Sequence, residues 1–361
     1  MTSRPNAKTG SPSHDDVLRI DVNERSPLSS EPLHKSNVGV VDIAKMANVS
    51  AITVSRTLRN PDIVSESTRN RILEIVRQTG YVSHPHARAL RTGHSSLVVA
   101  FISSMISPQY SIAMQKCADV LAEHGYQLLI GLTSYSYLKE VSGISMLRAV
   151  KPAAVLFTGV IELESNRQAL RDLDVPILES WAYPKDPIDM LVGFSNYDCG
   201  WMAATYLHAR QCRQVHFIGR KSGRGALRLK GFQAGAREFG LTVKDILLQD
   251  NVQSLYDSKN IYTQLKKNLS ANEGIFCAND ILALGLHADL KNDTTLQRKR
   301  PHMIGFGDLG YMSKTEPSLS VVGIDSEALG NKAALMILNR LQGKKQKTMD
   351  YVPVRIYEAT A

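Results

Sequence analysis

The chain has 361 residues, a formal net charge of +9 and 43% hydrophobic residues, so it is long enough for two or three domains with a sizeable core. Its four cysteines are scattered without a C-x-x-C pair, which favours free thiols over a disulfide framework or a thiolate metal site. No hydrophobic stretch approaches the ~18 residues of a membrane span, and residues 1–37 lack the apolar segment of a secretion signal. We expect a cytoplasmic protein with a disordered leader over residues 1–37, no cofactor and no metal.

The positive charge is concentrated near the N-terminus. Between Lys35 and Ser95 there are nine basic and four acidic residues, so a surplus of five falls within about one sixth of the chain. A local surplus of this kind is typical of a surface that binds nucleic-acid phosphates. The charge alone does not identify the partner. The residue pattern within this segment is more informative.

Residues 40–58 have the pattern of two short helices joined by a tight turn. Apolar residues recur at i, i+3, i+4 and i+7 over Val40–Ala47, which predicts an amphipathic first helix. Asn48 tolerates the left-handed backbone that a tight turn needs, and Ser50 is a favourable N-cap for a second helix over residues 51–58. The arrangement predicts a helix-turn-helix.

A third helix follows the second and completes a small core. The second helix would bury Val54 and Leu58. Ser65 can cap the third helix and Gly80 can end it. We expect its buried face to consist of Ile72, Leu73, Ile75 and Val76.

The string from Val41 to Arg56, followed by Val64-Ser65 and Gly80-Tyr81, resembles the head of the lac-repressor family of transcriptional regulators. The resemblance extends from about Val38 through the rest of the chain. It implies a DNA-binding domain over residues 38–82 whose second helix enters the major groove of an operator. Gly39 departs from the family, which usually has a hydroxyl side chain at this N-cap; glycine costs only a few tenths of a kcal/mol there.

The resemblance also implies which side chains contact DNA. The family's base-reading positions fall on Ala51, Ile52 and Arg56, and its phosphate contacts fall on Ser50, Thr53 and Ser55. The chemistry agrees, because arginine can read guanine and small apolar side chains can pack on thymine methyls.

Residues 83–95 are interpreted as a hinge. His84–Arg91 would form a basic helix that is too short to be stable alone in water, and an ordinary linker is the alternative. The resemblance implies a helix that pairs with its twin in the minor groove, with Ala87 at the close approach and Leu90 as the wedge between bases. Arg91 would contact DNA without regard to sequence. The order Ser83-His84-Pro85 departs from the family pattern.

Residues 96–361 alternate short apolar runs with helical stretches, which predicts parallel α/β sheets with ligands at the carboxyl ends of the strands. The expected strands are 97–102, 127–132, 153–157, 175–178, 191–194, 214–218, 274–277, 303–305, 320–322 and 352–357, with helices around 112–124 and 138–150. The alternation does not distinguish one large doubly wound sheet from two lobes. The family resemblance implies two lobes, like those of periplasmic binding proteins, joined by three crossovers.

Effector residues are carried over where motifs match. The family's helix arginine falls on Arg228, and the asparagine of its A-N-D motif falls on Asn279, which could equally be a helix cap. Asp308 is the acid that remains where many relatives have two, because Gly307 replaces the first. Losing a carboxylate near a retained arginine favours an anionic ligand. Residues 175–179, which end at Glu179, and residues 192–197 resemble the gluconate and ketogluconate branch, so we expect a sugar-acid effector.

Other functions fit the sequence less well. No nucleotide-binding, hydrolase or zinc-protease motif is present; the glycine-rich basic segment 219–225 could suggest a phosphate loop, but it fits no nucleotide fingerprint and is interpreted as preceding a cleft helix. A solute-binding protein of a transporter would suit the body but not the basic head. A sugar-processing enzyme is a second alternative, which steady turnover of a candidate sugar acid would reveal. We therefore expect no enzyme but a homodimeric repressor of sugar or sugar-acid catabolism, bound to a near-palindromic operator and released by its effector.

Overall fold

The computed structural model describes residues 38–58, 61–81, 95–133, 142–159, 161–184, 186–270, 272–296 and 300–359. The chain forms two compact units, which divide between Ser83 and His84. The predicted leader and the predicted hinge contacts of Ala87, Leu90 and Arg91 lie outside the described residues.

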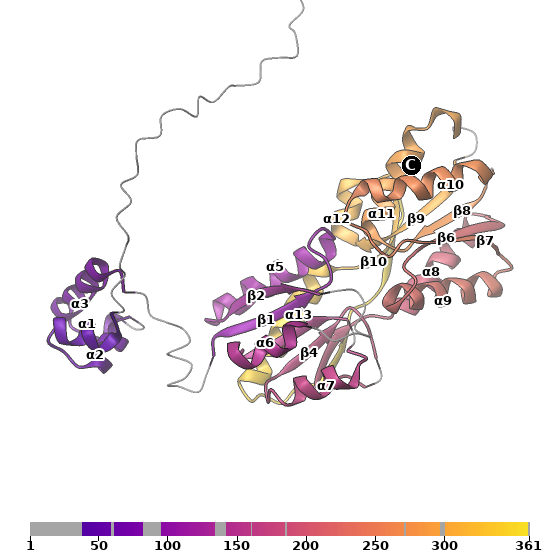
Figure 1. The fold of residues 1–361 in the computed structure, drawn as a ribbon. Helices are drawn as coiled ribbons and strands as arrows, with labels where there is room; N and C mark the ends of the chain where they lie inside the picture. The colour runs from indigo at the N-terminus through magenta and orange to yellow at the C-terminus, as the bar shows by residue number, and fades with distance from the viewer. Residues whose placement is uncertain are drawn as a thin grey trace, which may run out of the picture. The chain divides into compact units, whose positions relative to one another are not determined.

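The first unit contains the three predicted helices of the head (Figure 1). These are α1 (Val40–Met46), α2 (Ala51–Thr57) and α3 (Glu66–Thr79), with a 3-10 turn, η1 (Pro61–Ile63), between the last two. Asn48 and Gly80 adopt the left-handed backbone expected of them, with φ values of +48° and +60°. The turn and helix-end predictions are therefore confirmed.

The head buries one face of each helix around a small core. The fully or almost fully buried side chains are Ile43, Ala44, Ala47, Val54 and Ile72. The prediction for Leu73 is wrong, since this side chain is 43% exposed. Leu73 lies about 100° around the helix from its buried neighbour, and a three-helix head covers only a narrow stripe of α3.

The second unit contains two six-stranded sheets, one in each lobe (Figure 1). In order across the first sheet, the strands are β11 (Met349–Tyr351), β5 (Met190–Gly193), β4 (Ile177–Ser180), β3 (Ala154–Thr158), β1 (Leu97–Ile102) and β2 (Gln127–Leu132). In order across the second, they are β12 (Arg355–Tyr357), β10 (Ser320–Ile324), β9 (His302–Asp308), β8 (Gly274–Cys277), β6 (Gln214–Gly219) and β7 (Thr242–Leu248). All pairings are parallel except that of β10 with β12.

Helices cover both faces of each sheet. Those of the first lobe are α5 (Pro108–Glu123), α6 (Ser142–Val150), α7 (Glu164–Arg171) and α13 (Ser326–Leu341), with α5 packed on α13. Those of the second lobe are α8 (Asn196–Ala209), α9 (Gly223–Glu238), α10 (Lys259–Asn268), α11 (Asp280–Asn292) and α12 (Leu309–Thr315), with α8 packed on α9. Two further 3-10 turns are η2 (Leu255–Ser258) and η3 (Thr294–Leu296).

Three segments of the described chain pass between the lobes, as the resemblance implied. They follow β5, β10 and β11, because α8, α13 and β12 each belong to the lobe opposite to the strand that precedes them. The prediction of one strand over 352–357 is wrong. The segment contains the end of the third passage, and Pro353, which has no N–H for a ladder, lies between β11 in one sheet and β12 in the other.

Candidate functional sites

The outer side of α2 carries the residues predicted to contact DNA. Ile52 is 60% exposed, whereas Val54 on the opposite side is fully buried. Ser50 and Arg56 are exposed, and the partly exposed side chains are Ala51, Thr53 and Ser55. The six predicted residues thus lie on or beside one accessible surface of a short helix.

Ser50 fixes the beginning of that helix. Its Oγ accepts a hydrogen bond from the backbone N–H of Thr53 at 3.1 Å and lies 2.9 Å from the Thr53 hydroxyl oxygen. An N-cap of this kind satisfies one of the otherwise unpaired amides of the first turn. The remaining first-turn amides have no partner within the helix, so a phosphate could accept their hydrogen bonds.

A small pocket lies between the two lobes of the body. The first lobe contributes Gln109, Tyr110 and Trp181. The second lobe contributes Arg220, Ser222, Arg224, Gly225, Arg228, Asn279 and Phe306. None of the described residues that line the pocket is acidic, so the pocket has a strongly positive wall.

Arg228 is a buried cation of the pocket. Its Nη1 donates a hydrogen bond to Oδ1 of Asn196, and its guanidinium lies 4.1 Å from the centre of the Phe306 ring. Its buried Nε has no hydrogen-bond partner among the described residues. Burial lowers the pKa of Arg228 to about 10, and the nearby Asp280 opposes this fall.

The close packing of α8 on α9 places Arg228. A Cβ atom at Gly200 would lie only 1.9 Å from the carbonyl oxygen of Arg228, and one at Gly231 would lie 1.9 Å from the carbonyl oxygen of Tyr197. Because neither glycine has a Cβ, the two helix backbones approach closely. This approach holds the backbone of Arg228 against the start of α8, beside Asn196.

Asn279 both lines the pocket and caps a helix. Its Oδ1 accepts a hydrogen bond from the N–H of Leu282 at 3.0 Å, at the beginning of α11. The neighbouring Asp280 is buried, and its Oδ2 accepts hydrogen bonds from the Ser107 hydroxyl and, at 3.3 Å, from Nε2 of Gln109 in the other lobe. Burial raises the pKa of Asp280. These bonds link the lobes at the edge of the pocket.

Arg224 makes a second link between the lobes. Its Nη1 donates to the carbonyl oxygen of Thr158 at 2.8 Å, and its Nη2 donates to the Ser103 hydroxyl at 3.0 Å and the Tyr110 hydroxyl at 2.9 Å. All three acceptors belong to the first lobe. A ligand that binds Arg224 would therefore compete with, or add to, contacts that hold the lobes together.

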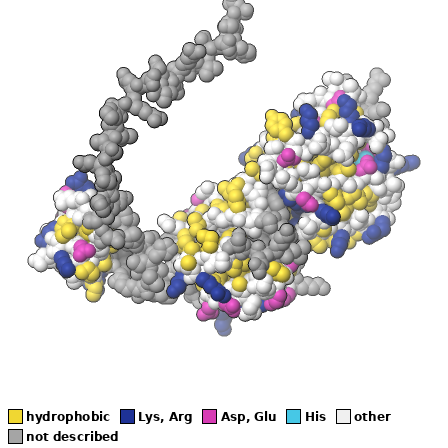
Figure 2. Space-filling view, in the orientation of Figure 1, with side chains coloured by type: hydrophobic (Ala, Val, Ile, Leu, Met, Phe, Trp, Pro, Cys, Tyr) yellow, Lys and Arg dark blue, Asp and Glu magenta, His cyan; other side chains and the backbone are white. Residues whose placement is uncertain are grey.

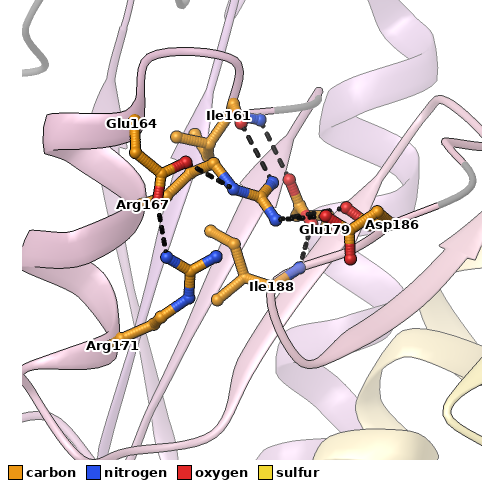
Figure 3. A network of polar contacts seen from close by, with 7 residues as sticks. All are labelled: Ile161, Glu164, Arg167, Arg171, Glu179, Asp186 and Ile188. Carbon is orange, nitrogen blue, oxygen red and sulfur yellow. Dashed lines mark hydrogen bonds and ion pairs between the residues drawn. The ribbon is translucent and has the colours of Figure 1, made fainter.

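The structure does not bring Glu179 to the pocket. Glu179 is fully buried in β4, where its two carboxylate oxygens accept the N–H groups of Ile161 and Ile188 at 2.9 and 2.8 Å (Figure 3). Burial raises the pKa of Glu179, and the two backbone bonds and Arg167 oppose the rise. Arg167 in turn lies 3.2 Å from the carboxylate of Asp186. These contacts fasten the loops that flank β4.

Asp308 also lies outside the pocket lining. Its Oδ1 accepts the N–H of Tyr311 at 2.7 Å and caps α12, while its Oδ2 accepts the N–H of Ser326 at 2.9 Å. A Cβ at Gly307 would lie 3.1 Å from the Cβ of Asp280. The carboxylate missing at residue 307 would therefore begin beside Asp280 and not beside Arg228.

The sequence analysis missed most of the pocket. The missed residues are Gln109, Tyr110, Trp181, Arg220, Ser222, Arg224, Gly225 and Phe306. Most of them follow the carboxyl end of a parallel strand, where the strand alternation already placed the ligand site. The available signal therefore indicated the edge of the sheets but not the individual side chains that face the cavity.

The comparisons with known proteins match both units. Residues 40–84 match the family described as bacterial regulatory proteins of the lacI family, and residues 204–358 match a periplasmic binding protein-like domain. The transcriptional regulator GntR of Pseudomonas aeruginosa is 29% identical over 306 residues, which cover 84% of this chain and 89% of that one. The repressor CytR of Escherichia coli K12 is 24% identical over 306 residues, with the same two coverages.

Solved structures have the same fold. A lacI-family regulator from Silicibacter pomeroyi superposes with a TM-score of 0.79 at 24% identity and covers 89% of this chain and 98% of its own. The lac repressor dimer bound to operator superposes with a TM-score of 0.72 at 20% identity, over 90% of this chain and 98% of its own. A helix-turn-helix head followed by a two-lobed ligand-binding body defines a DNA-binding transcriptional regulator. The head matches the lacI family of bacterial regulatory proteins, and the chain is similar over most of its length to transcriptional regulators that have the same two parts.

No helix within the described ranges is both long and apolar enough to cross a membrane.

Proposed function

We propose that this regulator represses its target genes from a near-palindromic operator and is released when a sugar acid binds between its lobes. The observation that carries the DNA-binding part is the capped helix α2, which buries Val54 and exposes Ile52 on its opposite side. Regulation of transcription, and not catalysis, is the role that both units support. We place the protein in the cytoplasm with the DNA.

On DNA, α2 would lie in the major groove. Arg56 would donate to guanine, while Ala51 and Ile52 would pack on thymine methyls. Ser50 and Thr53, whose hydroxyls meet at the beginning of the helix, would donate to phosphates with Ser55. We assign these roles to side chains that lie on or beside the accessible side of α2.

Arg228 would bind the carboxylate of the effector. It is buried, its Nε has no hydrogen bond, and the Phe306 ring covers one face of the guanidinium. Asn279 would donate to an effector hydroxyl while its oxygen continues to cap α11. Glu179 and Asp308 have no direct contact with the effector in this proposal, because each holds two backbone amides elsewhere.

A homodimer would form through exposed edge strands of the two sheets of the body. β2 and β7 are the last strands of their sheets, so each has an unpaired side. Both carry partly exposed large apolar side chains: Leu129, Ile130 and Leu132 on β2, and Ile246 and Leu248 on β7. Figure 2 shows hydrophobic side chains gathered near α5 and β2 of the first lobe. A second copy of the chain would cover this surface and present two heads to two half-sites.

Effector binding would act through the lobes. Arg224 and Asp280 already connect the two lobes beside the pocket, so a ligand held by both lobes changes the free energy of their arrangement. In a dimer, movement of one lobe against its twin would alter the separation of the segments that lead to the heads. We propose that operator affinity falls as a result.

Fluorescence anisotropy with a labelled operator tests the proposal. The operator is first recovered by sequencing the genomic fragments that the full-length protein binds. Arg56→Ala should then lower discrimination at one base pair by ~1–3 kcal/mol. Arg77→Ala is the matched control, because Arg77 is exposed on α3 and pairs with Glu74.

Three outcomes would count against the proposal. Equal losses on operator and scrambled DNA for Arg56→Ala would reduce that residue to a phosphate contact. Failure of the intact protein to prefer any native fragment would refute sequence-specific regulation. Release by neutral sugars alone would refute the sugar-acid effector but leave the DNA-binding function intact.

A further inference from the structure

A short lysine-rich loop joins α13 to β11 in the first lobe. Its residues 343–348 are Gly-Lys-Lys-Gln-Lys-Thr, so it contains three lysines and no acid. Lys344, Lys345 and Lys347 are all exposed. Within the described ranges, none of their three ammonium groups makes a hydrogen bond or an ion pair. The loop therefore carries positive charge that neighbouring side chains do not neutralise.

The backbone of this loop is held against the lobe. Gly343 ends α13 in the left-handed conformation, with a φ of +66°. The half-buried Gln346 donates a hydrogen bond from Nε2 to the carbonyl oxygen of Met336 at 2.7 Å. The carbonyl oxygen of Thr348 accepts the N–H of Leu191 at 2.8 Å, where β11 joins β5. The side chain of Gln346 faces the lobe, and the lysines on either side of it remain in solvent.

The loop lies at the edge of the sheet where the chain from the head enters the body. β11, β5, β4, β3 and β1 pair in parallel, so all five strands begin at this edge. The loop comes directly before β11, and Ser95, the first described residue of the body, comes shortly before β1. β11 and β1 are four strand spacings apart, or about 19 Å. The head is therefore tethered to the same edge that carries the lysines.

The acids nearest to the loop are paired with other cations. Asp189 comes just before the neighbouring strand β5, and its carboxylate lies 3.2 Å from the guanidinium of Arg340. Asp350 belongs to β11 itself, and its carboxylate lies 2.6 Å from the ammonium group of Lys332. Neither acid is left to offset the lysines of the loop.

Along the rest of this edge the charges nearly cancel. Asp172 and Asp186 each pair with an arginine of an adjacent helix, at 3.6 and 3.2 Å. The exposed charges that have no ion pair among the described residues there are Lys151, Asp174 and Glu123. One lysine thus stands against two acids, and with the loop included the edge keeps a surplus of two positive charges.

The plain alternative is that the loop is only a solvated surface. A cation near the C-terminus of a helix is favoured by the helix dipole, but this effect falls off within the last turn and does not account for three lysines beyond it. Like charges placed this close together repel one another, and an anionic partner relieves the repulsion. β11 is the edge strand opposite to β2, so the proposed dimer contact at β2 leaves the loop uncovered.

We propose that Lys344, Lys345 and Lys347 bind the phosphate backbone of the DNA that the head recognises. Duplex DNA carries one negative charge per about 1.7 Å of its axis, so it supplies the dense negative charge that the loop lacks. Lysine binds a phosphate as a point charge and needs no fixed geometry, which suits contact with any sequence. The body thus adds affinity for DNA in general, while α2 selects the operator. The inference rests on the proposed function only in that the protein binds DNA.

The salt dependence of DNA binding by the full-length protein tests this contact. The test variant carries Lys344→Gln, Lys345→Gln and Lys347→Gln together. Fluorescence anisotropy measures Kd from low to high salt on two duplexes, the recovered operator with its native flanks and a scrambled duplex of the same length. Loss of one phosphate contact per subunit of a dimer should lower the slope of log Kd against log salt concentration by about 1.8. We expect affinity for both duplexes to fall at least about fivefold at low salt, with their ratio unchanged.

A second triple variant is the matched control. Lys259→Gln, Lys267→Gln and Lys314→Gln remove the same net charge from exposed positions on α10 and α12 of the second lobe. This variant should keep the parent slope and affinity, because its lysines lie far along the chain from the proposed contact. Replacing the three loop lysines with arginine should also keep the slope. Thermal unfolding shows whether each variant is folded.

A measurement on the unaltered protein does not depend on the folding of any variant. Acetylation of lysines by a water-soluble reagent, followed by mass spectrometry, gives the reactivity of each lysine with and without DNA. Bound DNA should protect the loop lysines and leave the three control lysines as reactive as before. Equal labelling of the loop lysines in both states would overturn the proposal.

The binding outcomes separate this inference from the proposed function. An unchanged slope in the loop variant overturns the inference and leaves operator recognition by the head standing. Equal losses in the two glutamine variants also overturn it, because they would reflect net charge and not a contact. A parent protein that prefers no native fragment counts against the proposed function, while the scrambled duplex still tests the loop. A parent protein that binds no DNA at all overturns both.

Discussion

Replacing Arg228 with methionine separates what this residue does for the ligand from what it does for the protein. The lowering of the Arg228 pKa to about 10 corresponds to a cost of roughly 3 kcal/mol for holding the buried charge. Its hydrogen bond to Asn196 offsets about 1.5–3 kcal/mol of this cost, and its contact with the Phe306 ring offsets up to about 2 kcal/mol. Methionine keeps much of the volume and removes both the cost and the offsets. The free energy of unfolding should therefore change by no more than roughly 2 kcal/mol.

The ligand should respond much more strongly than the stability. Loss of the cation that faces a buried carboxylate costs about 2–5 kcal/mol of binding free energy. This corresponds to a Kd that is roughly 30- to 4,000-fold weaker. Operator binding should survive, because the head is a separate unit, and Arg228→Met should therefore repress without being released.

Three measurements check this prediction on the same preparation. Calorimetry with the sugar acid gives Kd, differential scanning calorimetry gives Tm, and anisotropy gives operator release. Arg237→Met is the matched control, since Arg237 is an exposed residue in the last turn of α9 and should change none of the three. An unchanged Kd for Arg228→Met would refute the carboxylate contact. A fall in Tm of more than about 8 °C would contradict the expectation that the cost of burying the Arg228 charge is nearly offset by its contacts with Asn196 and Phe306.

Three further predictions follow from other parts of the chain. Ser50→Ala removes the cap on the Thr53 amide and should lower the stability of the head by about 1 kcal/mol, measured by urea unfolding, whereas Ser50→Gly should cost less; equal losses would contradict the capping role. Gly200→Ala would place a Cβ 1.9 Å from the carbonyl oxygen of Arg228, so it should destabilise the body by about 1–3 kcal/mol or more and also weaken effector binding; a stable variant with normal affinity would contradict the close approach of α8 and α9. Burial raises the pKa of Asp280 above its unfolded value, so the folded protein holds this proton to higher pH and loses stability as pH rises through that window; the stability of Asp280→Asn relative to the parent should rise with pH from 4 upward, and a constant difference would refute the shift.

Much of the head was predictable because its signals are local. The apolar spacing before Ala47, the turn at Asn48 and the cap at Ser50 each act within a few residues, and all three are present in the structure. The error at Leu73 has a different origin. The helical pattern shows which residues are apolar, but the width of the buried stripe depends on how much surface two short neighbouring helices cover.

In the body, too, features set by local sequence were predicted better than features set by contacts between distant segments. The ranges of β1, β2 and β8 were predicted to the residue, because each is an apolar run with clear boundaries. The last predicted strand was divided between two sheets, since which sheet a strand joins depends on pairings far along the chain. β7, an edge strand whose exposure alternates along its length, was missed altogether.

The effector site was harder to predict than the fold. Arg228 and Asn279 reached the pocket because they match family motifs, but the acids Glu179 and Asp308 instead hold backbone amides. Sequence alone does not show whether a buried carboxylate faces a cavity or a loop. That depends on the direction of its strand and on which amides lie within hydrogen-bond distance.

The sequence by itself determined the class of this protein: a basic helix-turn-helix head, a body of alternating strands and helices, and a ligand site at the strand ends. The spacing of apolar residues, helix capping and local charge depend on residues that are close together in the sequence, so they can be recognised without a structure. Tertiary structure decided which side chains meet. Three arginines that the sequence spreads over nine residues become the wall of one pocket, because β6 ends there and two glycine contacts bring α9 against α8.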